Sequence, residues 1–105
     1  MSNDNRIQKV YISGKISGIE EEAKVLFDAT EETLKHLGYD VINPMTLPHN
    51  HDKSWERYMR EDLKALLDCD IIFMLHNWKE SDGAKFEYSI AMKLGMPIIF
   101  ENENT

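Results

Sequence analysis

Short apolar runs that alternate with longer helical stretches are the feature that most constrains the fold of this chain. The runs are rich in β-branched residues, and the stretches between them repeat apolar residues every three or four positions. They predict strands over 9–13, 39–43, 71–75 and 97–100, and helices over 19–37, 54–68 and 81–94. Because short connections and right-handed crossovers are the rule, this order favours a doubly wound α/β fold with a mostly parallel sheet.

The length of the chain supports a single domain over residues 1–105. A chain of 105 residues is large enough for one compact core and too short for two. The expected architecture is a flavodoxin- or Rossmann-like three-layer sandwich with about four strands. Its 19 acidic and 12 basic residues give a net charge of −7, which argues against a nucleic-acid polymer as partner.

The N-terminus and the single cysteine indicate where the protein works. No basic segment is followed by an apolar one, and no apolar run approaches the ~20 residues that span a bilayer. Cys69 is the only cysteine, so a disulfide framework is excluded and a buried thiol is expected. We therefore expect a cytoplasmic protein without membrane contact.

A carboxylate interrupts the apolar stripe of the last predicted helix. In the stretch S-D-G-A-K-F-E-Y-S-I-A-M-K-L, the core-facing positions are those at helical spacing, namely Ala84, Glu87, Ile90, Ala91 and Leu94. Glu87 lies near the helix start, after an apolar strand, where open α/β sheets bind ligands. We expect it to face a ligand pocket.

A second carboxylate, Asp62, interrupts the stripe of the middle predicted helix. That helix starts after Ser54, and its apolar positions are Trp55, Tyr58, Met59, Leu63, Leu66 and Leu67. Burial raises a carboxyl pKa, so one acid of a pair can donate a proton while the other stays ionised. Such a pair suits glycosidic bond cleavage, where a retaining mechanism needs carboxyls roughly 5 Å apart. The alternative is that each acid is structural, and Asp70 at the start of its strand is interpreted that way.

Other polar residues are candidates for binding. Ser13, Gly14 and Lys15 form a loop after the first strand, and its glycine permits close ligand approach. Ser81, Asp82 and Gly83 could cap a helix and offer donors to a phosphate, or form an ordinary cap. Trp78 could stack on a base, or pack at a rim or subunit contact. The cluster His49, His51 and Asp52 matches no standard metal spacing, so no metal site is predicted.

The order of three motifs resembles the nucleoside 2-deoxyribosyltransferase-like superfamily. The motifs are V-Y-I-S-G-K-I-S-G over 10–18, E-D-L-K-A-L-L-D-C-D-I-I-F over 61–73, and S-D-G-A-K-F-E-Y-S-I-A-M-K-L-G-M-P-I-I over 81–99. This superfamily includes the deoxynucleoside 5′-monophosphate N-hydrolases and the group named domain of unknown function 4406. The resemblance covers most of the chain, from Val10 to Phe100.

The resemblance implies roles for individual residues. Glu87 would attack the sugar C1′, and Asp62 would protonate the base and then activate water or an acceptor. Ser81 and Gly83 match phosphate-contacting positions, whereas Tyr11 and Gly14 match residues lining the sugar pocket.

Two departures from the superfamily pattern bear on the substrate. The monophosphate hydrolases carry an arginine where this chain has Ser17, so a phosphate would depend on Lys15. The chain also ends after the fourth strand, whereas the transferases continue.

These observations lead to one hypothesis and two alternatives. The hypothesis is cleavage or transfer at the N-glycosidic bond of a (deoxy)nucleoside or its 5′-monophosphate, without metal or organic cofactor. The first alternative is a non-catalytic nucleotide-binding module for regulation or assembly, and the second is a purely structural oligomer. Tyr88 and Met92 lie four apart at the edge of the apolar arc, which favours a homo-oligomer.

Overall fold

The architecture is a four-stranded parallel sheet with three helices. The computed structural model describes residues 6–49 and 54–101. The elements within them are β1 (Lys9–Ser13), α1 (Glu20–His36), β2 (Asp40–Ile42), the short 3-10 helix η1 (Pro44–Thr46), α2 (Trp55–Leu67), β3 (Ile71–Met74), the 3-10 helix η2 (Trp78–Glu80), α3 (Asp82–Lys93) and β4 (Ile98–Phe100). The sheet has the order β2-β1-β3-β4, and all three strand pairs are parallel. The predicted α/β fold is therefore confirmed.

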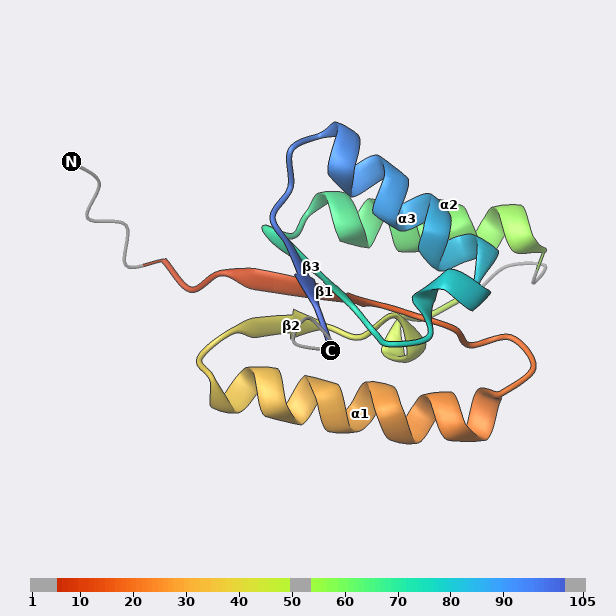
Figure 1. The fold of residues 1–105 in the computed structure, drawn as a ribbon, viewed down its shortest axis with the longest axis horizontal. Coiled ribbons are helices and arrows are strands. Elements are labelled where there is room, and N and C mark those ends of the chain that lie inside the picture. The colour runs from red at the N-terminus through yellow and green to blue at the C-terminus, as the bar shows by residue number, and fades with distance from the viewer. Residues whose placement is uncertain (1–5, 50–53, 102–105) are drawn as a thin grey trace.

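The sheet separates two layers of helices. Figure 1 shows α1 on one face of the sheet and α2 and α3 together on the other. Alternate residues of β1 serve the two faces, because successive side chains of a strand point in opposite directions. Val10 and Ile12 pack with α1, whereas Tyr11 packs in the cluster formed with α2 and α3. The strand order reverses at β1, which places the ligand crevice of such sheets at the carboxyl ends of β1 and β3.

The helix boundaries follow from local sequence signals. The Ser54 hydroxyl accepts the Arg57 N–H at the start of α2, and the Ser81 hydroxyl accepts the Ala84 N–H at the start of α3. Gly38 follows α1 with a φ of +97°, a conformation that favours glycine. The predicted helix starts and stops therefore agree with the structure to within one or two residues.

Three residues placed in the apolar stripes are exposed instead. Trp55, Leu67 and Leu94 have exposed fractions of 51%, 57% and 62%. Trp55 and Leu67 are the first and last residues of α2, and Leu94 caps α3. A short sheet covers only the middle of each helix, so side chains at the ends extend beyond the packed layer. The prediction that these three face the core was wrong.

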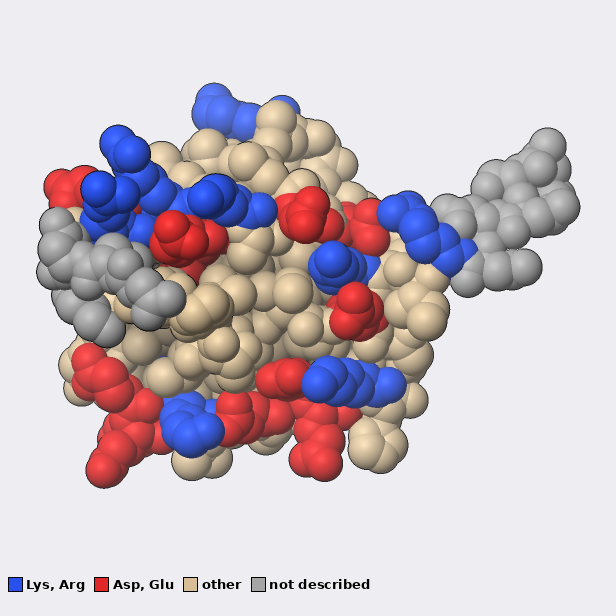
Figure 2. All heavy atoms as spheres, turned by 180° about the vertical axis from the view of Figure 1, so that it is seen from behind, with Lys and Arg blue, Asp and Glu red and all other residues tan. Residues whose placement is uncertain are grey.

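Charge is distributed unevenly over the surface. Helix α1 carries six carboxylates and two lysines. Figure 2 shows these acidic side chains along the lower margin of the molecule, below a central area with few charges. None of the helices in the described part of the chain is long and apolar enough to cross a membrane.

Residues singled out as structural lie where expected. The Asp70 carboxylate accepts the Lys9 N–H at 2.9 Å and contacts Arg6 at 3.2 Å, joining the start of β1 to the start of β3. Cys69 is a free, buried thiol, and burial raises its pKa to about 12. The Cys69 thiol therefore stays protonated at neutral pH, and the Asp70 carboxylate is occupied by its two partners.

Candidate functional site

A pocket of about 370 Å³ opens at the carboxyl end of β1, at the expected crevice. Its wall combines the end of β1, the first loop, the start of α1, the segment after β2 and the first two turns of α2 and α3. This volume is in the range of small-molecule sites. The pocket is lined by Tyr11, Ile12, Ser13, Gly14, Ile16, Ser17, Glu20, Pro44, Met45, His49, Trp55, Tyr58, Met59, Asp62, Ser81, Gly83, Ala84 and Glu87.

Glu87 is the buried carboxyl group of this pocket. Only 5% of the residue is exposed. The Tyr11 hydroxyl donates to its Oε2 at 2.8 Å, and the Ser13 hydroxyl donates to its Oε1 at 2.6 Å. Tyr11 and Ser13 are two apart in β1, so both side chains leave the same face of the sheet. The central strand therefore fixes both oxygens of Glu87.

The surroundings make Glu87 hard to ionise. Burial has the largest effect, and the pKa of Glu87 is raised to about 8. The hydrogen bond from Ser13, the next largest effect, and the one from Tyr11 both lower the pKa, whereas the Asp62 charge raises it. Burial, followed by the Glu87 charge, raises the pKa of Tyr11 well above its usual range. The Tyr11 hydroxyl consequently keeps its proton and remains a donor.

Asp62 reaches the same pocket from α2. Burial raises its pKa to about 6, the charge of His49 lowers it, and the charge of Glu61 raises it. Its Oδ1 lies 3.8 Å from His49 Nε2. Two carboxyl groups with different environments therefore line one pocket, as the two interrupted stripes predicted.

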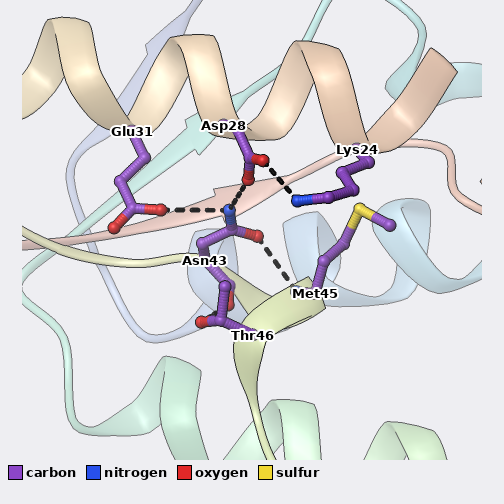
Figure 3. Close-up of polar contacts among 6 residues, drawn as sticks. All are labelled: Lys24, Asp28, Glu31, Asn43, Met45 and Thr46. Carbon is purple, nitrogen blue, oxygen red and sulfur yellow. Dashed lines mark hydrogen bonds and ion pairs between the residues drawn. The ribbon is translucent and has the colours of Figure 1, made fainter. Parts of the chain in front are cut away.

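One wall of the pocket is fixed by the buried side chain of Asn43. Its amide nitrogen donates to Asp28 Oδ1 and Glu31 Oε1, both at 3.1 Å, and its Oδ1 accepts the Met45 N–H. Figure 3 shows these bonds joining α1 to the segment after β2, with Lys24 paired to Asp28. The lining residues Pro44 and Met45 are thereby held to a helix on the opposite face of the sheet.

The start of α3 supplies polar groups to the pocket. Ser81 and Gly83 both line it. The Ser81 oxygen accepts the Ala84 N–H at 3.1 Å, which leaves its own O–H to donate elsewhere. The ordinary cap and the ligand contact are therefore compatible.

Gly14 is required by close packing against Leu75. A β-carbon at this position would lie 2.6 Å from Leu75 Cδ1 and 2.9 Å from Leu75 Cβ. We expect Gly14→Ala to destabilise the fold by about 1–3 kcal/mol, because Leu75 is fully buried and must shift. Urea denaturation measures the difference. Gly83→Ala is the control, since its β-carbon would meet the flexible Met59 side chain at 3.2 Å and Ser81 Oγ at an ordinary 3.9 Å. Equal stability of the two variants would contradict the packing argument.

Two predicted substrate-contacting residues lie outside the lining of the pocket. The Lys15 ammonium donates to the Glu80 carbonyl at 3.4 Å, and the Lys15 N–H donates to Asn77. Trp78 packs on Tyr88 and Phe100, with ring centroids 4.6 and 6.1 Å away, as in the rim-packing alternative. The structure therefore does not bring Lys15 and Trp78 together with Glu87.

Sequence reasoning missed several pocket residues, His49 above all. His49 stood out only as a doubtful metal ligand, and its cluster partners His51 and Asp52 lie outside the described residues. Within the described ranges, no three His, Cys, Asp or Glu side chains gather as a metal site. Tyr58 was assigned to the apolar face and also lines the pocket. The available signal was a histidine shortly before the helix that carries Asp62, and a tyrosine one turn before Asp62 within that helix.

Comparisons with known proteins identify a family and solved structures that are similar to this chain. The model of a family described as domain of unknown function (DUF4406) matches residues 8–100. No curated protein matches the sequence. A 2-deoxyribosyltransferase from Bacillus psychrosaccharolyticus is similar in structure, with a TM-score of 0.68, 26% identity, and coverage of 88% of this chain and 70% of that one. A 2-desoxiribosyltransferase from Leishmania mexicana also has a TM-score of 0.68, at 15% identity over 89% of this chain and 63% of its own.

Proposed function

The chain belongs to the family described as domain of unknown function 4406, and from this premise we propose that it cleaves or transfers the N-glycosidic bond of a (deoxy)nucleoside or its 5′-monophosphate. The fold it shares with 2-deoxyribosyltransferases supports glycosyl transfer to or from a nucleoside. The proposed chemistry uses two side chains, Glu87 and Asp62, and requires no cofactor.

The observation that carries the proposal is the buried Glu87 carboxyl, held at both oxygens in a pocket that also contains Asp62. In the proposed reaction a Glu87 oxygen bonds to the sugar C1′ while the C1′–N bond breaks. The electron pair of that bond goes to the base nitrogen, and Asp62 supplies its proton. Water or a second base then attacks C1′, gives its proton to Asp62 and releases Glu87.

The remaining lining residues would bind the substrate. Gly14 lets the sugar approach the end of β1, and the Ser81 hydroxyl and Gly83 stand where the sugar 5′ end or its phosphate would reach the start of α3. Ser13 and Tyr11 would act through Glu87, since their hydroxyl groups donate to it. Under this proposal, recognition occurs at the loop after β1 and at the start of α3, on either side of the nucleophile.

The test is base release from a panel of nucleosides, deoxynucleosides and their 5′-monophosphates, followed by chromatography. Each substrate is incubated with and without a second free base, for the wild type and for Glu87→Gln. Release that depends on Glu87 supports the proposal, and a new nucleoside formed only with added base identifies transfer. Silence of the folded wild type across the panel would contradict the proposal.

One observation favours the alternative of a nucleotide-binding module. A pKa of about 8 leaves Glu87 mainly protonated at pH 7, and a protonated carboxyl is a poor nucleophile. Saturable nucleotide binding at pH 7 and pH 9, without base release at either, would support binding alone. Base release that is highest between pH 6 and 8, where the pair of carboxyl groups holds one proton, would support the enzyme.

A further inference from the structure

The imidazole of His49 and the carboxyl of Asp62 form a close pair inside the pocket. Their Nε2 and Oδ1 atoms are 3.8 Å apart, and each side chain is 14% exposed. The two residues come from different segments, the stretch after η1 and helix α2. The pair is not accounted for by the motifs that single out Glu87 and Asp62.

Among the described residues, the Asp62 oxygen nearest His49 has no hydrogen-bond partner. This Oδ1 is the one buried side-chain nitrogen or oxygen without a hydrogen-bond partner in the part of the chain that the structure describes. Buried polar atoms in folded proteins nearly always have such a partner, so an exception at a pocket indicates a functional group. The nearest described basic group to Asp62 Oδ1 is the His49 imidazole, whose Nε2 lies 3.8 Å away, slightly beyond hydrogen-bond distance.

The His49 imidazole is held beside Asp62 by two contacts. Its Nε2 lies 3.3 Å from the Pro44 carbonyl oxygen, which can only accept, so Nε2 carries a hydrogen. That single hydrogen must turn from Pro44 to donate to Asp62 Oδ1, which lies 3.8 Å from Nε2. The ring also packs edge-on against Tyr58, with centroids 4.7 Å apart and planes at 60°. Pro44 in turn begins the segment that Asn43 fixes to α1 (Figure 3). The imidazole is therefore fixed by a carbonyl and a ring beside the carboxyl group.

We propose that His49 is a positioning residue for the acid/base step: it holds the Asp62 carboxyl and stabilises the carboxylate formed when Asp62 gives its proton to the departing base. This inference rests on the proposed function. In that step the proton leaves Asp62 for the base nitrogen, the C1′–N electron pair follows the base, and His49 keeps its own hydrogen. In the second step Asp62 takes a proton from water or the acceptor base.

The groups around Asp62 agree with this role. Its other titratable neighbours are Glu61 on α2, Glu87 on α3 and Tyr11 on β1. None of these three can carry a positive charge. Among the described groups that influence Asp62, His49 is thus the one that favours its ionised form.

Substrates with different leaving groups test the proposal. Deoxynucleosides need a proton on the departing base, whereas 4-nitrophenyl 2-deoxyriboside releases a stable anion and does not. We expect His49→Ala to lower kcat on deoxynucleosides by about 10-fold or more, which is part of the 10²- to 10⁴-fold that a general acid supplies. On the aryl deoxyriboside, kcat of the variant should stay within about 2-fold of the wild type. His49→Gln keeps an N–H donor and should recover part of the loss.

A titration independent of turnover completes the test. The ¹³C signal of the Asp62 carboxyl, assigned by its loss in Asp62→Asn, should titrate at higher pH in His49→Ala than in the wild type. His36→Ala, on exposed helix α1, is the control and should change neither readout. An unshifted Asp62 titration, or equal kcat losses on both substrate types, would overturn the inference. A wild type that releases no base from any substrate would instead overturn the proposed function, and the titration would still decide whether His49 acts on Asp62.

Discussion

Replacing Glu87 with glutamine is expected to abolish base release and to stabilise the protein at alkaline pH. Glutamine has the same shape, so its oxygen can accept from Ser13 while its amide nitrogen donates to the Tyr11 oxygen. The amide cannot form the glycosyl ester, however, and we expect kcat to fall by about 10³-fold or more. The loss of turnover would then occur in a folded protein.

The gain in stability follows from the raised pKa of Glu87. The carboxyl titrates near its usual value of 4.5 in the unfolded chain and at about 8 in the folded one. Its contribution to stability is therefore complete below pH 4.5 and is lost as pH rises through 8. Glutamine has no such dependence, so Glu87→Gln should be more stable than the wild type by on the order of 4 kcal/mol at pH 8, and no more stable below pH 4.5.

Urea denaturation of both proteins at pH 4, 6 and 8 measures this difference. Asp70→Asn is a matched control, because the partners of Asp70 lower its pKa and its removal should destabilise the protein at neutral pH. A constant difference between Glu87→Gln and the wild type across this range would contradict the assignment of a buried, protonated Glu87.

The second prediction concerns Asp62 and the pH profile of the wild type. With pKa values of about 6 for Asp62 and about 8 for Glu87, the pair holds one proton between these values, mostly on Glu87. The reactive form has the proton on Asp62 instead and carries the same total charge. This form makes up about 1% of the singly protonated pair, because the two pKa values differ by about two units. Its population is highest between the same two pKa values. We expect kcat/KM to be bell-shaped, with its maximum between pH 6 and 8.

Asp62→Asn should change both the size and the shape of this profile. Loss of the general acid should lower kcat on deoxynucleosides by about 10²- to 10⁴-fold. The alkaline decline should disappear, because no acid remains to be deprotonated, and residual activity should rise with pH to a plateau. Loss of the Asp62 charge also lowers the pKa of Glu87, so the rise should occur below pH 8. Steady-state kinetics from pH 5 to 9 measure it, and an unchanged bell in Asp62→Asn would exclude Asp62 as the acid.

Local sequence patterns predicted the fold and the two acids for physical reasons. A carboxylate within an apolar helical stripe faces the sheet because the backbone geometry of the helix leaves it no other direction. Glu87 and Asp62 were therefore placed correctly inside the protein before any contact was known. The same reasoning failed for Trp55, Leu67 and Leu94, since periodicity shows which side of a helix is apolar but not how far the sheet extends beneath it.

Contacts between distant segments could not be predicted in this way. Ser13 was expected to touch a ligand, yet its hydroxyl donates to Glu87, 74 positions away. Lys15 was expected to bind the substrate, yet its ammonium donates to the Glu80 carbonyl. His49 lies in an irregular segment without periodicity, so its approach to Asp62 depends on the path that Asn43 gives that segment. Register and loop path, unlike helix direction, are set by tertiary packing.

The anchoring of the pocket has an evolutionary consequence. Glu87 is fixed by the central strand, whereas the wall from Pro44 to His49 is fixed through Asn43 to a helix across the sheet. Mutations can therefore accumulate in that wall, apart from His49, and change what enters without disturbing the bonds that orient the Glu87 carboxyl. A laboratory selection for new substrates would best randomise Met45 and its neighbours while keeping Asn43, His49, Tyr11 and Ser13. One scaffold could in this way diversify its ligands while its central carboxyl stays in place.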